Sequence, residues 1–231
     1  MMALPYTPGQ VAVRHGEEDG GLAPGLDGMP VVLCTVHSQV APVCAALAGL
    51  RVAYVQVQGG ALPVSLSDTV RALKERGLVE VACAVAPCLD GDARFVTVAA
   101  ALAWACHAGH DAAVCAVGPG IVGTGTRLGH GALALAEAAD VAAALGGAPV
   151  LAVRTSEADE RERHRGVSHH ARAVLGLALA EIAVPDEADG EGWEEACAGL
   201  PLAHMGRGPA DDPAFFRAAY AAGVAARRRA R

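Results

Sequence analysis

The sequence predicts an α/β fold. Short apolar segments alternate along the chain with longer segments of helical pattern, which is typical of consecutive βαβ units. The apolar segments are hydrophobic at nearly every position, as expected for parallel strands buried on both faces. Hydrophobic residues make up 53% of the 231 residues, enough for a substantial core. We therefore expect a three-layer αβα sandwich whose mostly parallel, Rossmann-like sheet has five or six strands.

Each strand is expected where an apolar run ends at a glycine, a proline or a polar turn. Each helix is expected where an alanine-rich or amphipathic segment follows a capping residue. The expected caps are Ser65 or Ser67, Ser168, and Asp211 or Asp212. The expected strands are 30–36, 51–58, 79–87, 111–118, 148–155 and 181–186, and the expected helices are 41–50, 65–78, 94–109, 131–147, 168–180, 191–200 and 211–229.

This pattern divides the chain into three parts. Residues 1–29 are weakly patterned and form an N-terminal extension or an edge strand. Residues 30–186 form the α/β domain. Residues 187–231 form a C-terminal helical appendage, in which Phe215, Phe216 and Tyr220 are expected to pack on the domain or on a second subunit.

Composition excludes several classes of function. The net charge of −7 offers no basic surface of the kind that nucleic acids require, so no nucleic-acid partner is expected. No apolar run is long enough to suggest a membrane span. The seven cysteines contain no CxxC pair, which argues against a zinc ribbon. Their odd number, without a signal peptide, favours the reducing cytoplasm.

Polar or glycine-rich segments follow five of the expected strands. In a parallel sheet the carboxyl ends of the strands lie at one edge, and ligands bind there. The connections at the opposite edge contain little besides capping glycines. We therefore expect one site built jointly from the five segments, which are 35–38, 58–63, 88–92, 118–131 and 154–170.

The segment 118–131, "GPGIVGTGTRLGHG", has six glycines in fourteen residues. Glycines let a backbone approach a ligand closely, and the start of the following helix favours an anion. Arg127 would complete a bidentate clamp. No GK[ST] follows, so this is not a P-loop, and a flexible connection is the alternative. The candidate substrate-binding residues are Gly118, Gly120, Gly123, Thr124, Gly125, Thr126 and Arg127.

The segment 161–172, "RERHRGVSHHAR", concentrates three histidines and four arginines. A helix start favours neutral imidazole, which a general base must be. His164 and His169 are candidate catalytic residues, and Ser168 is a candidate substrate-binding residue. Neighbouring helical residues point about 100° apart, so at most one of His169 and His170 is expected to face the position that His164 reaches. A polar loop with surface ion pairs is the alternative.

The remaining candidates follow other strands. His37 follows the first strand and Asp92 the third, and both are candidate catalytic residues, with Asp92 orienting a histidine. Gly59, Gly60 and Arg154 are candidate substrate-binding residues at the same edge.

Several motifs together resemble a known family. "GPGIVGTGTRLG" and "ERHRGVSHH", with "VHS", "GGALP" and "GMPVV", are similar to the bacterial family catalogued as domain of unknown function 3866. The resemblance runs from "YTPGQ" to "LGLAL" and implies a bacterial cytoplasmic protein without an established activity. Family members typically carry a β-rich segment ahead of "YTP", so the chain resembles their C-terminal part or a short version. "CLDGD" replaces a more usual glycine pair, which weakens a role for Asp90 more than one for Asp92.

Three functions are compatible with these residues. The first is a small-molecule enzyme, a hydrolase or transferase, acting on an anionic and possibly phosphorylated substrate. The second is a non-catalytic ligand-sensing or homo-oligomeric assembly module, for which alanine-rich helices are suited. The third is a metal site formed by His37, Asp92 and either His164 or His169, which their spacing does not support. A small anion and a second copy of the chain are the expected partners, and the sequence identifies no cofactor.

Overall fold

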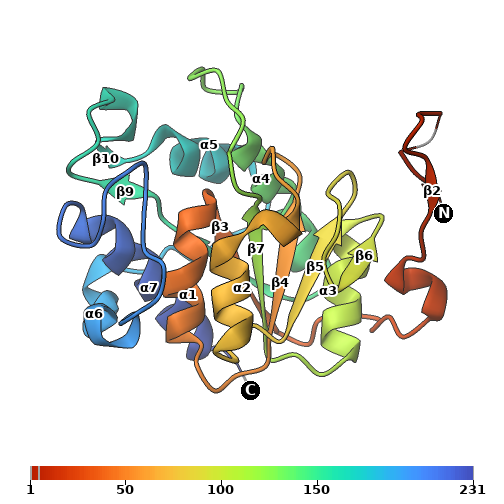
Figure 1. Cartoon of the computed structure of the whole chain (residues 1–231). Coiled ribbons are helices and arrows are strands. Elements are labelled where there is room, and N and C mark those ends of the chain that lie inside the picture. The colour runs from red at the N-terminus through yellow and green to blue at the C-terminus, as the bar shows by residue number, and fades with distance from the viewer. Residues whose placement is uncertain (1, 5, 231) are drawn as a thin grey trace.

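A computed structural model describes residues 2–4 and 6–230. Six parallel strands form the central sheet in the order β6-β5-β4-β7-β3-β8 (Figure 1). This confirms the predicted α/β class and the parallel sheet. The strands are β3 (Pro30–Cys34), β4 (Val52–Val57), β5 (Val81–Val85), β6 (Ala93–Phe95), β7 (Ala112–Val117) and β8 (Ala148–Ala152).

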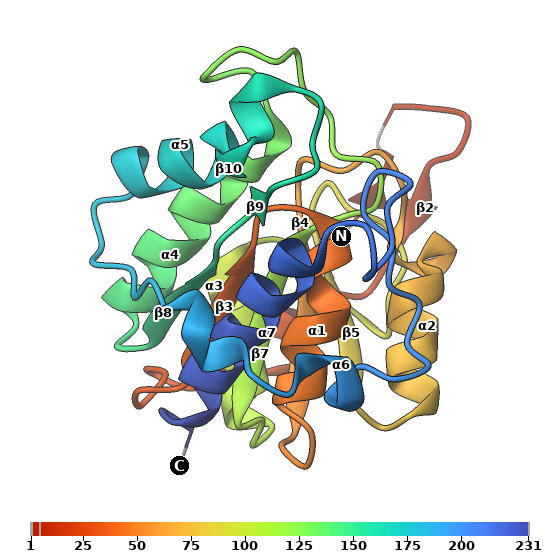
Figure 2. The ribbon, with the colours of Figure 1, turned by 90° about the vertical axis from the view of Figure 1, so that its left-hand side faces the viewer.

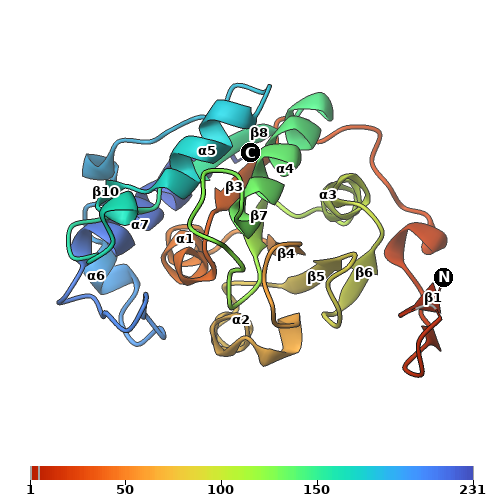
Figure 3. The same cartoon turned by 90° about the horizontal axis from the view of Figure 1, so that it is seen from above.

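Helices cover both faces of the sheet, as Figure 3 shows from above. Alternate strand residues point to opposite faces, so Val114 packs with α1, α2 and α7 whereas Cys115 packs with α3 and α4. All six residues of β7 are buried, which accounts for its continuous apolar sequence. The helices are α1 (Val40–Ala46), α2 (Asp68–Glu75), α3 (Val98–His107), α4 (Ala134–Ala144), α5 (His169–Leu177), α6 (Trp193–Ala196) and α7 (Pro213–Arg227).

Side-chain hydrogen bonds explain where two of these helices begin. The Ser67 hydroxyl accepts from the Val70 amide over 3.0 Å, so Ser67 rather than Ser65 caps α2. Ser168 caps α5 as predicted, by accepting from the His170 amide. Asp212 occupies the cap position of α7, but its carboxylate binds other side chains instead.

Two expected elements differ from the structure. Residues 93–95 form strand β6 rather than the start of a helix, because a short loop turns back along β5 and the Asp92 carboxylate accepts from the Ala82 amide. Residues 181–186 do not form a strand. Only Ala183 pairs with β8, at Val150, and Pro185 has no amide hydrogen to extend the pairing.

The N-terminal segment lies apart from the main sheet. Its strands β1 (Met2–Ala3) and β2 (Val11–Ala12) pair only with each other. A second two-stranded pair, β9 (Thr155–Ser156) with β10 (Gly166–Val167), follows β8 and encloses the segment that leads to α5. This pair brings the two ends of segment 155–167 together.

Helix α7 packs against α1 on one face of the sheet, as Figure 2 shows. Gly223 makes this close packing possible, because a Cβ there would lie 2.6 Å from Cβ of Ala46. Phe215 and Phe216 are fully buried beside Trp193. The division of the chain at residue 187 stays a prediction, and α7 contributes to the same core as α1 and β3.

The topology separates two neighbouring loops at the carboxyl edge. Neighbouring strands β3 and β7 continue to helices on opposite faces, α1 and α4, and their loops diverge. Ligand sites of open α/β sheets form where the loops of neighbouring strands diverge in this way.

Among the described residues, no helix is long and apolar enough to cross a membrane.

Candidate functional site

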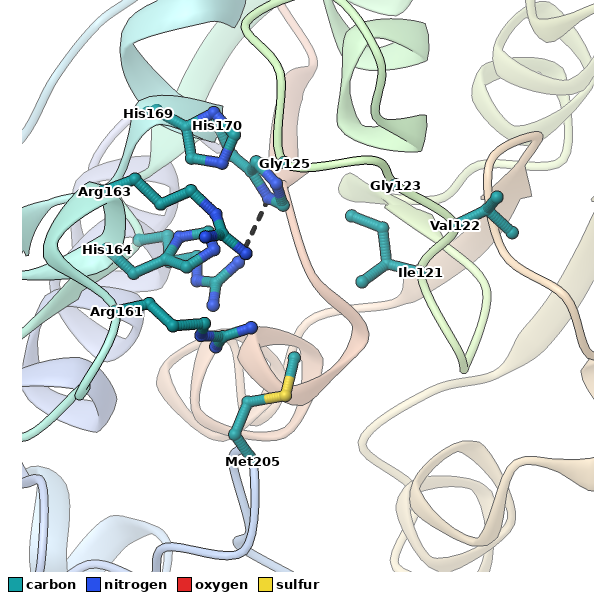
Figure 4. A pocket seen from close by; sticks show the side chains of 11 residues that line it. Ile121, Val122, Gly123, Gly125, Arg161, Arg163, His164, His169, His170 and Met205 are labelled. Atoms are coloured by element: carbon teal, nitrogen blue, oxygen red, sulfur yellow. Dashed lines mark hydrogen bonds between the residues drawn. The ribbon is translucent and has the colours of Figure 1, made fainter.

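A cavity of about 100 Å³ lies at the carboxyl edge, between the loop after β7 and the segment after β8 (Figure 4). Residues 121–123 and Gly125 form one wall, and Met205 approaches from the C-terminal part of the chain. Within the described chain, no carboxylate lines the cavity. Its polar side chains are Arg154, Arg161, Arg163, His164, His169 and His170.

Arg154 lies two residues beyond the end of β8 and is only 1% exposed. Its Nη1 donates to Nδ1 of His170 over 3.1 Å, and its Nη2 lies 3.7 Å from the Asp159 carboxylate. Burial lowers the pKa of Arg154 to about 10, with help from the charge of Arg161 and against that of Asp159. In the part of the chain that the structure describes, Nε and Nη2 have no hydrogen-bond partner. A buried guanidinium with unused donors beside a cavity is suited to an anion.

Asp159 holds the arginines in place. It is 1% exposed and accepts hydrogen bonds from Arg161 and Arg207. Burial raises the pKa of Asp159, but hydrogen bonds and charge from Arg161 outweigh this effect and hold that pKa below its usual range. Arg207 also binds Asp212, which accepts from Ser156 over 2.5 Å. The loop before α7 is thereby joined to the wall of the cavity.

Four imidazoles gather at this point. The ring centroid of His130 lies 4.1 Å from that of His170 and 5.1 Å from that of His169. His164 lies 4.8 Å from His169 and 5.0 Å from His170. The expectation that only one of the adjacent pair faces His164 is therefore wrong, because side-chain torsions bring both rings round from the helix start.

These histidines are neutral at pH 7. Burial, and then the charges of Arg154 and Arg161, lower the pKa of His164 to about 3. Burial, and then His130 and nearby arginines, lower the pKa of His169 to about 4. Nδ1 of His164 lies 2.7 Å from the Ser168 hydroxyl, which orients the ring.

The loop after β7 forms a hairpin, part of which lines the cavity. Gly123 pairs with His130, and the Thr124 amide donates to the Gly129 carbonyl. Gly125 lines the cavity with a φ of +82°, and a Cβ there would lie 3.3 Å from the Arg163 guanidinium. Glycine suits both the conformation and the close approach.

The tip of this hairpin projects beyond the carboxyl edge of the sheet (Figure 1). Thr124, Thr126 and Arg127 are exposed, and Thr124 and Thr126 bond to each other over 3.0 Å. None of the three lines the cavity. The expected anion clamp at Arg127 is thus not formed here, because the hairpin carries that residue outward and the α-helix that follows does not begin until residue 134.

The other candidate glycines hold the backbone in place. A Cβ at Gly59 would lie 2.5 Å from the Gly131 carbonyl oxygen, and one at Gly118 would lie 2.6 Å from Nε2 of Gln56. Gly60 pairs with Ile121, and Gly120 has a φ of +71°. These four glycines pack two loops together and lie outside the cavity lining.

His37 lies at the same edge but outside the cavity. Its Nε2 lies 2.7 Å from the Ser67 hydroxyl and its Nδ1 3.4 Å from the Tyr54 hydroxyl. Burial lowers the pKa of His37 to about 4. Both ring nitrogens are engaged in linking α2 to β4.

Asp92 does not orient a histidine. It binds Nζ of Lys74 at 2.6 Å and the Ala82 amide, near the start of β5 rather than its end. The loop that precedes β6 carries it there. The metal site expected from His37, Asp92 and His164 or His169 is therefore not assembled.

The family described as "Protein of unknown function (DUF3866)" matches residues 1–196. The chain belongs to the DUF3866 family. No curated protein and no solved structure matches the chain.

In this DUF3866 protein, sequence reasoning did not select four of the residues that meet here, namely His130, Arg161, Arg163 and His170. The dense "RERHRGVSHH" run contained the signal for three of them. His130 had no distinguishing pattern, since only the hairpin pairing brings it under α5. Arg207 and Asp212, which support Asp159 and Ser156, lie beyond the family match.

Proposed function

We propose that this protein is an enzyme that binds a small anionic substrate, carrying phosphate or carboxylate, and catalyses its hydrolysis or a group transfer. The observation that carries the proposal is the cavity lining. Three arginines and three histidines converge from segment 154–170, and no carboxylate of the described residues lines the cavity with them. Planar guanidinium groups recognise oxyanions through paired hydrogen bonds.

The local charge supports an anion. Four arginines meet here, namely Arg154, Arg161, Arg163 and Arg207, and two aspartates, Asp159 and Asp212, are paired with three of them. Four positive charges against two negative charges leave a net excess of two positive charges. A phosphate monoester or a dicarboxylate would balance that excess.

His164 is the group suited to exchanging a proton. Ser168 engages its Nδ1, and in the described part of the chain no hydrogen bond engages Nε2. An anion between Arg154 and Arg163 would cancel part of the charge that lowers the pKa of His164, so binding would raise that pKa toward neutrality. Substrate binding would thereby activate the base.

All seven cysteines are unpaired, which supports a reducing cytoplasmic location as part of this proposal.

Calorimetry with inorganic phosphate tests the binding step. Arg163→Gln should weaken binding at least tenfold, whereas Arg165→Gln, two residues away and outside the cavity lining, should leave it within twofold. Equal effects of the two variants would refute the assigned pocket.

Turnover on a panel of phosphate and carboxylate esters tests catalysis. His164→Asn should abolish turnover while phosphate binding persists. Phosphate binding by the unaltered protein without turnover of any ester would refute the enzyme and favour the sensing module.

A further inference from the structure

His130, His169 and His170 form a group to which the proposed function assigns no chemical role. Each offers a ring nitrogen, and the three nitrogens lie within 4.8 Å of one another. Ligand nitrogens of a tetrahedral zinc site, with bonds of about 2.0–2.1 Å, lie roughly 3.3 Å apart. Small side-chain rotations would close that difference, since His169 and His170 begin a helix and His130 ends a hairpin.

The hydrogen bonding of these rings is incomplete. His130 is 6% exposed; the Arg127 backbone interacts with its ring, and neither ring nitrogen makes a hydrogen bond of standard geometry to a described residue. Nε2 of His169 is likewise buried without a partner in that part of the chain. Buried polar atoms are nearly always satisfied, and unsatisfied ones call for an explanation such as an ion. Coordination to one metal ion would satisfy both rings.

The backbone fixes the positions of the three rings. His130 itself pairs with Gly123 across the hairpin. The residues just beyond the ligands, Ala132 and Ala171, are fully buried in the same core cluster. Two segments 39 residues apart are thus held together by packing that does not depend on the metal.

Arg154 connects this site to the cavity. It donates to Nδ1 of His170, which leaves the ring proton on Nε2. Coordination through Nδ1 would replace the arginine, and coordination through Nε2 would move the proton to Nδ1, which would also end that contact. In either case Arg154 becomes free to bind an anion.

We propose that His130, His169 and His170 bind a divalent transition metal of the zinc class, with its open position toward the cavity beside Arg154. Three imidazoles with an open fourth position are the ligand set of a catalytic zinc site. Imidazole also suits copper, nickel and iron. Three nitrogen ligands therefore select a metal of this class and exclude calcium and magnesium, which prefer oxygen ligands. The surrounding arginines require an anion, hydroxide or substrate, in the fourth position.

The inference rests on the proposed function only for that fourth ligand. The three histidines stand independently of it, because none of the arginines coordinates the metal.

Metal analysis of the full chain tests the site. Purified protein, treated with a chelator and then dialysed against Zn²⁺, should retain one zinc per chain and bind Co²⁺ with a tetrahedral absorption spectrum. His130→Ala and His169→Ala should each lower zinc affinity at least a hundredfold. His107→Ala, at an exposed histidine outside the cluster, should have no effect. His130→Gln, judged folded by circular dichroism, covers the case in which the alanine variant unfolds.

Zinc retention equal in the unaltered protein and in His130→Gln would overturn the metal site. Phosphate calorimetry on the chelator-treated protein separates this failure from failure of the proposed function. Phosphate binding through Arg163 without zinc binding overturns only the metal. Zinc binding without phosphate binding supports the metal and overturns the anion pocket.

Discussion

Removing the Asp159 carboxylate should destabilise the protein strongly. Asp159 and Arg154 are each 1% exposed, and Asp159 also binds Arg161 at 2.8 Å. Breaking a buried ion pair by deleting one partner costs about 3–5 kcal/mol, because the remaining charge stays buried without compensation. We expect Asp159→Ala to cost an amount in that range. A domain of this kind has about 5–15 kcal/mol of stability in total, so the loss is large.

Urea unfolding followed by circular dichroism measures this loss. The transition midpoint should fall with little change in slope. Glu160→Gln, an exposed neighbour, should change stability by less than about 0.5 kcal/mol. If Asp159→Ala does not fold, Asp159→Asn keeps the shape and removes the charge.

Added phosphate should restore part of the stability of Asp159→Ala. A bound anion would replace the missing carboxylate, and stabilisation by a ligand grows with its concentration above Kd. The reasoning would be refuted by a loss below about 1 kcal/mol, or by phosphate stabilising Glu160→Gln more than Asp159→Ala.

Three further results are expected. Gly223→Ala should lower the unfolding midpoint, because its Cβ would lie 2.6 Å from that of Ala46, whereas Gly176→Ala, with open space around it, should raise stability by about 0.5–1 kcal/mol. Ser67→Ala should cost about 1 kcal/mol in urea unfolding through loss of the α2 cap, and no loss would refute that role. Burial lowers the pKa of His37 to about 4, so neutral His37 should contribute up to roughly 3 kcal/mol to the free energy of unfolding. This contribution should be complete above about pH 6.5 and should disappear as the pH falls to about 4. His37→Asn should flatten this part of the pH dependence, and an unchanged slope would contradict the assignment.

The αβα architecture could be predicted for two reasons. Each buried strand is apolar on both faces, and turn residues separate each helix from the strands before and after it. Strand β6 could not, since its three residues continue into an alanine-rich helix and pair only because the Asp92 loop turns back. A strand was expected at 181–186, but only Ala183 pairs with the sheet. The apolar character of a segment does not show whether a neighbouring strand lies close enough to pair with it.

Part of the cavity lining could be predicted from the sequence, whereas the role of these residues stays a prediction. Arg154, His164 and His169 lie at the cavity with Gly123 and Gly125. Arg127 does not lie at the cavity, because the hairpin carries it outward. The number of glycines in a loop does not reveal which way a hairpin points its residues.

The sequence by itself determined the alternation of strands and helices along most of the chain, β6 and residues 181–186 excepted, and the edge at which polar segments collect. Both follow from local hydrophobic periodicity and the direction of parallel strands. Only the tertiary structure decided which side chains of that edge meet. His130 joins His170 through a hairpin pairing, and Arg207 reaches Asp159 from beyond residue 200. Such contacts depend on the path of loops and on the packing of distant segments, which no local pattern records.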